Sequence, residues 1–89
     1  MEINIIKANY LRDYIIEFEF NDKTKQVVDF KDFLDNAKHP DIKKYLDKNL
    51  FKTFSIIDGD IDWGDFDLTF PIWDIYTNNI VKNKSQEAS

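Results

Sequence analysis

The sequence predicts an α+β fold, an antiparallel β-sheet of about five strands with two short helices packed on it. Apolar and acidic residues alternate over residues 14–20, which is the pattern of a half-buried strand. Apolar residues recur at helical spacing between residues 30 and 50, and the Asp-Gly pair at 58–59 is typical of a hairpin turn. A chain of 89 residues can form one hydrophobic core. We therefore expect a single domain over residues 1–80 and a polar, disordered tail over residues 81–89.

Three strands are expected before residue 30. The first covers Ile3–Ala8. The second covers Tyr14–Phe20 and places its apolar residues on one face and its acidic residues on the other. Asn21–Thr24 has the composition of a turn, because Asn and Asp tolerate left-handed backbone and bond to their own chain. Lys25–Val28 then returns as the third strand.

Two helices and two further strands follow. Asp29 is the predicted N-cap of the first helix, whose apolar residues are Phe30, Phe33, Leu34 and Ala37. Pro40 suits the first position of the second helix, whose apolar stripe contains Ile42, Tyr45, Leu46 and Leu50. Phe51–Ile57 is expected to be a strand that turns at Asp58-Gly59 into the next one. Residues 66–76 are aromatic but irregular, and Pro71 marks a last helical turn.

The composition excludes several classes of protein. Cysteine is absent, which excludes a disulfide scaffold, a thiolate zinc site and a cysteine nucleophile, and which fits an intracellular location. With two glycines the chain has no Gly-rich phosphate loop, and no segment reaches the ~20 apolar residues of a membrane helix. We therefore expect a cytoplasmic protein. The net charge of -5 disfavours binding to nucleic acid or anionic membranes and favours a basic partner.

Five aspartates lie between residues 58 and 67, and alternating carboxylates are typical of calcium loops. The calcium pattern fails because Trp63 stands where glycine is needed and Thr69 stands where a bidentate glutamate is needed. We therefore expect no metal and no cofactor, and we interpret Asp60 and Asp62 as the solvent side of a strand whose other side, with Trp63, points inward. The single histidine, His39, precedes Pro40 in a polar junction and is expected to be a surface cap or a loop residue, so no catalytic residue is predicted.

The aromatic residues near the C-terminus are the remaining feature. Core packing is their default role, but protein interfaces favour Trp and Tyr, and acidic neighbours suit an Arg-rich partner. The candidate partner-binding residues are Trp63, Phe66, Trp73, Tyr76, Asp60 and Asp62.

Short motifs along the chain occur in an order that resembles a known bacterial family. They are Phe20-Asn21-Asp22, Val28-Asp29-Phe30, Phe51 and Phe54, Asp58-Gly59-Asp60-Ile61-Asp62-Trp63, Asp67-Leu68 and Ile75-Tyr76. Over residues 2–76 the chain is similar to the family called domain of unknown function 2442, with Lys23 where that family commonly has glycine. The resemblance implies antiparallel strands with helices packed on them, no enzyme activity, and a toxin-antitoxin-like pairing with a neighbouring protein.

Three hypotheses on function follow. The leading one is an antitoxin-like interaction module that holds a basic partner protein through its negative surface and its aromatic residues. The alternative is a small ligand-binding or enzymatic domain that uses the acidic cluster Asp58–Asp67. The third is a structural homodimer that pairs through an exposed edge strand such as Ile3–Ala8.

Overall fold

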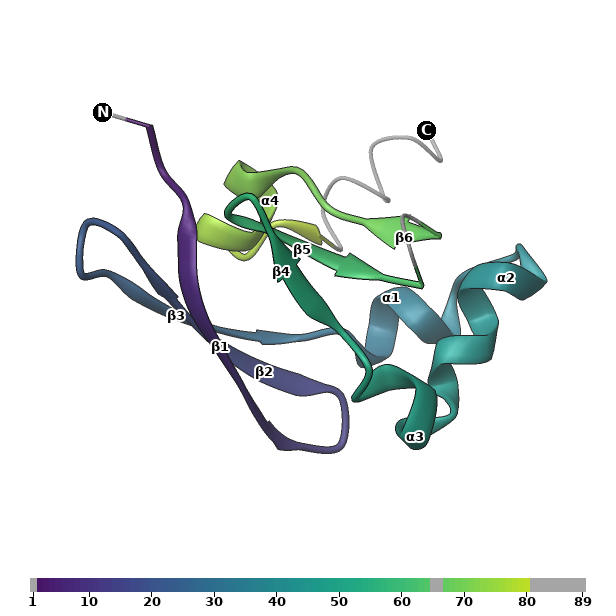
Figure 1. Cartoon of the computed structure of the whole chain (residues 1–89). Coiled ribbons are helices and arrows are strands. Elements are labelled where there is room, and N and C mark those ends of the chain that lie inside the picture. The colour runs from purple at the N-terminus through teal and green to yellow at the C-terminus, as the bar shows by residue number, and fades with distance from the viewer. Residues whose placement is uncertain (1, 65–66, 81–89) are drawn as a thin grey trace.

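The computed structural model describes residues 2–64 and 67–80. It is an α+β structure, as expected, but its six strands within these residues form two antiparallel sheets rather than one sheet of about five strands (Figure 1). The first sheet contains, in spatial order, β1 (Ile5–Arg12), β2 (Ile15–Phe20) and β3 (Lys25–Asp29). The second contains β4 (Ser55–Ile57), β5 (Asp60–Trp63) and β6 (Leu68–Thr69).

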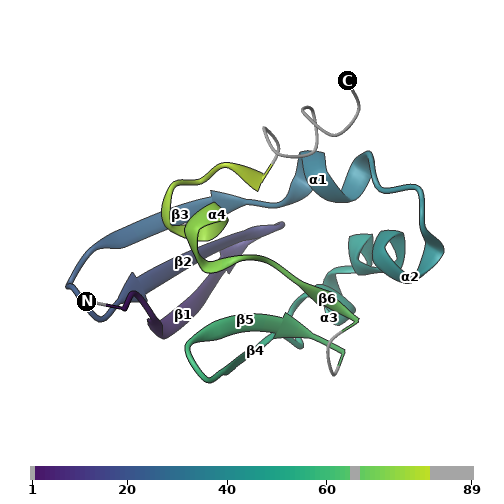
Figure 2. The same cartoon turned by 90° about the horizontal axis from the view of Figure 1, so that it is seen from above.

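The two sheets meet where β1 runs beside the β4–β5 hairpin. The Ile5 amide donates to the Gly59 carbonyl over 2.8 Å, and in Figures 1 and 2 β1 is the strand of the first sheet nearest to β4. The two strands form no ladder with each other, and for this reason the strands divide into two sheets. β1 also bulges between Ile5 and Lys7 and again between Tyr10 and Arg12, which bends it along its length.

β2 confirms the alternation seen in the sequence. Ile16, Phe18 and Phe20 are fully buried, whereas the residues between them are partly exposed on the outer face of the sheet. The turn to β3 is also as expected, because Lys23 adopts a left-handed φ of 73° and the Asp22 carboxylate accepts the Thr24 amide over 2.9 Å. Lys23 thus adopts at this turn a backbone conformation that glycine adopts without strain.

The first helix begins later than its apolar pattern suggests. α1 covers Lys31–Asp35, and Phe30, which offers no side-chain acceptor, occupies the N-cap position. Asp29, the predicted cap, instead accepts the Lys31 amide through its carboxylate over 2.9 Å. The apolar side of the helix is oriented as expected, since Phe30 and Leu34 are each 1% exposed.

The second predicted helix is broken into three short pieces. These are α2 (Pro40–Lys43), the 3-10 helix η1 (Lys44–Leu46) and α3 (Lys48–Phe51). The break falls at Asp47, which has extended backbone (ψ 115°) and whose carboxylate accepts the Asn49 amide over 2.9 Å. Asp47 therefore acts as a new N-cap. The predicted strand Phe51–Ile57 is correspondingly too long, because Phe51 ends α3 and only Ser55–Ile57 pairs as β4.

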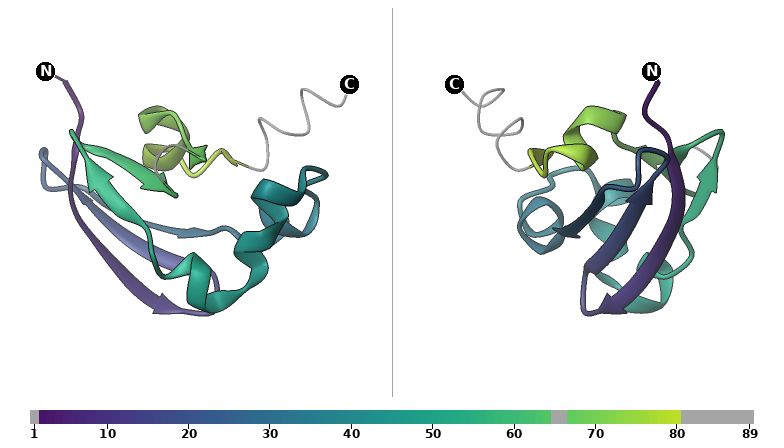
Figure 3. Two further views of the ribbon diagram at one scale, coloured as in Figure 1. Left: turned by 45° about the vertical axis from the view of Figure 1, so that its right-hand side comes forward. Right: turned by 90° about the vertical axis from the view of Figure 1, so that its left-hand side faces the viewer.

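The last helix, α4 (Ile72–Tyr76), follows Pro71 as the sequence predicts. Figures 1 and 3 show α1, α2 and α3 grouped at one end of the sheets, with α4 apart from them near the β2–β3 hairpin. None of the helices in the described ranges is long and apolar enough to span a membrane.

An aromatic core joins the sheets and helices. Its centre is Trp63, which is fully buried, and whose indole N–H donates to the Phe51 carbonyl over 2.8 Å. The rings within 6.3 Å of the Trp63 ring, measured between centroids, belong to Phe30, Tyr45, Phe51, Phe54 and Phe70. Because these rings come from helices, strands and loops, the core holds every part of the described fold in place.

Candidate functional site

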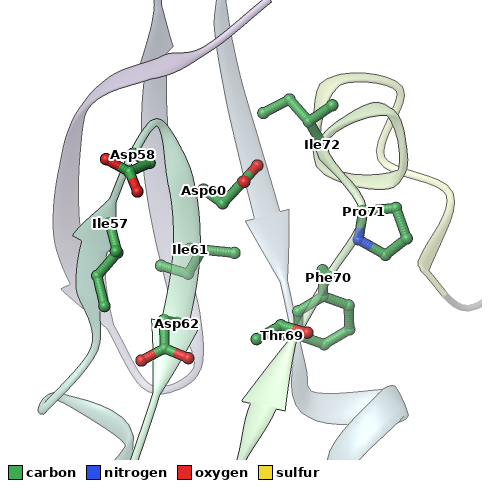
Figure 4. A pocket seen from close by; sticks show the side chains of 9 residues that line it. All are labelled: Ile57, Asp58, Asp60, Ile61, Asp62, Thr69, Phe70, Pro71 and Ile72. Atoms are coloured by element: carbon green, nitrogen blue, oxygen red, sulfur yellow. The ribbon is translucent and has the colours of Figure 1, made fainter. Parts of the chain in front are cut away.

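A groove lies between the β4–β5 hairpin and the segment that leads from β6 into α4 (Figure 4). It has a volume of about 600 Å³ and we call it the hairpin groove. Its lining residues are Ile57, Asp58, Asp60, Ile61, Asp62, Thr69, Phe70, Pro71 and Ile72. The groove coincides with the acidic cluster that the sequence singles out, and it adds an apolar wall that the cluster alone does not indicate.

The groove exists because β6 pairs with β5 over only two residue pairs. Asp62 lies opposite Thr69 and Trp63 lies opposite Leu68, and beyond Thr69 the ladder stops. Pro71 has no amide hydrogen to continue a ladder, and its φ of −57° and ψ of 142° lead the chain directly into α4. The first half of β5 therefore has no paired strand on this side among the described residues.

The wall of the groove formed by the β4–β5 hairpin is held in place by the tight turn of that hairpin. Asp58 and Gly59 have φ values of 53° and 85°, which are the left-handed values of a type I′ turn. A Cβ on Gly59 would lie 2.5 Å from the side-chain oxygen of Asn4, so the turn is packed closely against the N-terminal segment. This packing holds the backbone of the turn in place beside the N-terminal segment.

The lining residues give the groove a negative charge. Asp58 and Asp60 are exposed at its rim, and none of the lining residues within 2–64 and 67–80 is basic. Figure 4 shows the Asp60 carboxylate directed toward Ile72 across the groove. The wall formed by the segment between β6 and α4 offers Pro71 and Ile72 as apolar surface. A ligand with a cationic end and an apolar stem would match both walls.

Asp62 corrects one expectation from the sequence. Alternation along β5 predicts that it faces solvent with Asp60, but Asp62 is only 3% exposed. β5 is the central strand of its sheet, between β4 and β6, and Ile61, Asp62 and Trp63 are all buried. Both faces of the strand are therefore covered at this point, and simple alternation no longer separates inside from outside. Asp62 lines the groove from within, and Asp60 supplies the accessible carboxylate.

The predicted aromatic residues separate into two groups. Trp63 lies in the core and offers no surface to a partner, whereas Trp73 on α4 is 55% exposed. Tyr76 packs edge-on against Trp73, with 5.1 Å between ring centroids, and its hydroxyl donates to the Asp22 carboxylate over 2.7 Å. Tyr76 thus anchors the helix that presents Trp73. Phe66 lies outside the described residues.

The hydrogen bond from Tyr76 changes the acidity of Asp22. It lowers the pKa of the Asp22 carboxyl below its ordinary value of 3.8, and the Thr24 amide acts in the same direction. Further along, burial raises the pKa of the Tyr45 phenol; the Lys44 ammonium opposes this effect. Neither group lines the groove, so we assign them structural roles.

Two smaller expectations can be compared with the structure. His39 caps α2, because its Nδ1 accepts the Asp41 amide over 3.1 Å, which is the first of the two roles expected for it. Among residues 2–64 and 67–80, no three His, Asp or Glu side chains are placed to hold a metal ion together.

Sequence reasoning found the acidic half of the groove and missed the apolar half. The sequence predicts a helix start at Pro71, but a proline that follows a two-residue strand also marks the point at which a sheet edge opens. That signal could have located Thr69 and Ile72 as lining residues. Comparison of the chain with protein-family models, with curated proteins and with solved structures found no match in any of the three.

Proposed function

We propose that this chain is a non-enzymatic interaction module that binds an extended, basic segment of a partner protein in the hairpin groove. The observation that carries this proposal is the combination of two exposed carboxylates, Asp58 and Asp60, with an apolar wall of Pro71 and Ile72, in a groove to which the described part of the chain contributes no cation. A lysine or arginine side chain has the matching form, because its alkyl stem packs on apolar surface while its charged end meets carboxylates.

Charge on the whole chain supports the same partner. The net charge of -5 attracts a basic protein from a distance and increases the rate of encounter. Trp73 follows the groove residue Ile72 in the sequence and is exposed. It offers an aromatic surface of the kind that contributes strongly to binding at interfaces. The resemblance to domain of unknown function 2442 makes an antitoxin-like role the most specific form of this proposal.

The experiment uses two double variants that each remove two negative charges. Asp58→Asn with Asp60→Asn changes the groove rim, whereas Glu17→Gln with Glu19→Gln changes the outer face of the first sheet. An extended peptide that alternates arginine and leucine is titrated into each protein, and binding is mapped by NMR amide shifts. We expect the rim variant to bind about tenfold more weakly and the control to bind nearly as the natural chain does.

Two results would contradict the proposal. One is equal loss of affinity in both double variants, which would indicate attraction by net charge alone. The other is a set of shifted amides that excludes residues 57–62 and 69–72. Co-expression with the protein encoded next to this chain then tests the antitoxin-like form, which requires a stoichiometric complex that the rim variant weakens.

A small-ligand function is the second candidate, and the size of the groove favours it. A volume of about 600 Å³ lies within the range of small-molecule sites. The corresponding probe is a polyamine, which carries cations on an apolar stem but has no peptide backbone. Tighter binding of the polyamine than of the peptide, with shifts at the same residues, would favour this alternative over the interaction module.

A further inference from the structure

β3 is an edge strand whose outer side has no neighbouring strand within the described residues. Figure 2 shows β3 at the margin of the first sheet, with β2 between it and β1. Edge strands expose backbone groups that can pair with another chain. This edge differs from Ile3–Ala8, the edge suggested by the sequence, which lies beside the β4–β5 hairpin and whose Ile5 amide already bonds to Gly59.

The hydrogen bonds at both ends of β3 show which backbone groups point outward. Phe20 donates to the Thr24 carbonyl and Phe30 donates to the Tyr14 carbonyl, each over 2.9 Å. Backbone groups alternate in direction along an antiparallel strand, so the even-numbered residues of β3 bond to β2. Lys25, Val27 and Asp29 therefore direct their N–H and C=O groups to the open side.

The side chains of these same residues lie on the outer face of the sheet. Lys25, Val27 and Asp29 are exposed, and Val27 is 45% exposed at the middle of the strand. Their order along the chain is basic, apolar, acidic. In an antiparallel pair of two identical strands centred on Val27, each lysine lies opposite the aspartate of the other copy. Registers centred on Lys25 or on Asp29 would place like charges opposite each other.

We propose that a second copy of this chain binds antiparallel to the β3 edge, with Val27 opposite Val27 and Lys25 opposite Asp29 of the second copy. The symmetry is that of an isologous dimer, in which one edge meets the same edge of its partner. The cross-strand order of the sheet agrees with this, because Lys7 lies opposite Glu19 and Glu19 lies opposite Lys25. Asp29 of the second copy continues this row of alternating charge across the interface.

The first test is the oligomeric state measured by sedimentation over a range of concentrations. We expect dimers for the natural chain and about tenfold weaker dimerisation for Lys25→Glu, which places like charges opposite each other twice. Lys7→Glu is the matched control, because Lys7 also lies opposite Glu19 but on β1, at the other side of the sheet from β3, and this variant should dimerise as the natural chain does. Lys25→Glu combined with Asp29→Lys should restore dimers.

The second test uses the absence of cysteine from the chain. Val27→Cys should form a disulfide-linked dimer under mild oxidation, since paired residues of this kind lie within the Cα separation that a disulfide spans. Glu17→Cys, one strand inward from the edge and opposite Val27, should remain unlinked. A natural chain that is monomeric at every concentration overturns the proposal. So does a dimer that neither responds to Lys25→Glu nor links through residue 27.

Discussion

At the scale of single residues, the two tryptophans show how similar side chains take different roles. Trp63 is fully buried and Trp73 is 55% exposed. The difference follows from their elements, because β5 is covered on both faces, whereas α4 is a short helix at the surface. Trp63 also bonds to the Phe51 carbonyl, which fixes the C-terminal end of α3 against the second sheet. One indole therefore serves packing and the other remains accessible for binding.

Trp63→Phe tests the structural role of the buried indole. The variant leaves a void and removes the indole N–H. Within the described residues, this is the one side-chain donor to the buried Phe51 carbonyl. We expect the free energy of unfolding to fall by about 2–4 kcal/mol. Urea denaturation followed by circular dichroism measures this loss. Trp73→Phe is the control and should change stability by less than about 0.5 kcal/mol. Equal losses in the two variants would contradict the assignment.

At the scale of elements, the sequence predicts best where one local signal decides the structure. The alternation of β2, the Asp58-Gly59 turn and the start of α2 at Pro40 are confirmed because strand pattern, turn chemistry and proline geometry act within a few residues. The broken helix over residues 40–51 was not predicted, because its apolar spacing suits a continuous helix. Only the capping bond of Asp47 reveals the break.

The candidate site was predictable to the same extent. Asp60 lies at the groove rim as its exposure in a strand suggests, but the burial of Asp62 depends on how β6 pairs back onto β5, with Thr69 opposite Asp62. The apolar wall at Ile72 depends on how α4 packs after Pro71. Both features result from tertiary contacts, which local patterns do not contain.

Gly59→Ala tests the hairpin that forms one wall of the groove. At a φ of 85° any side chain is strained, and a Cβ here would lie 2.7 Å from the Cβ of Asn4. We expect a loss of about 1–3 kcal/mol of stability in urea denaturation. Asp58→Asn is the control, because Asn-Gly suits a type I′ turn, and it should stay within about 0.5 kcal/mol of the natural chain. A stable Gly59→Ala protein would show that the turn can relax.

At the scale of the whole molecule, contacts between distant segments hold the fold closed. Tyr76 near the end of the described chain reaches the first hairpin, where its hydroxyl bonds to Asp22 and its backbone carbonyl accepts the side-chain amide of Gln26 over 3.0 Å. Phe20 packs edge-on against the Tyr76 ring, with 4.9 Å between centroids. These contacts place α4, and with it Trp73 and Ile72, against the first sheet. The proposed partner binding at the groove thus depends on a contact between Tyr76 and Asp22, which are 54 residues apart in the sequence.

The bond between Tyr76 and Asp22 makes part of this closure depend on pH. Because the bond lowers the pKa of Asp22 in the folded state below 3.8, folding is favoured when Asp22 is ionised. The resulting stability is fully present above the pKa of the unfolded chain and is lost as the pH falls through the lower pKa of the folded protein. Tyr76→Phe removes the largest cause of the lowered pKa.

We therefore expect the natural chain to be more stable than Tyr76→Phe near neutral pH, and the difference to shrink as the pH falls below 3.8. Urea denaturation at a series of pH values measures the difference, and other acids titrate alike in both proteins and cancel. Tyr10→Phe is the control, because the Tyr10 hydroxyl donates to the Asp13 backbone carbonyl, which does not titrate. Its effect should stay constant across the same pH range. If the Tyr76→Phe difference were equally constant, the hydroxyl would stabilise α4 without coupling to the charge of Asp22.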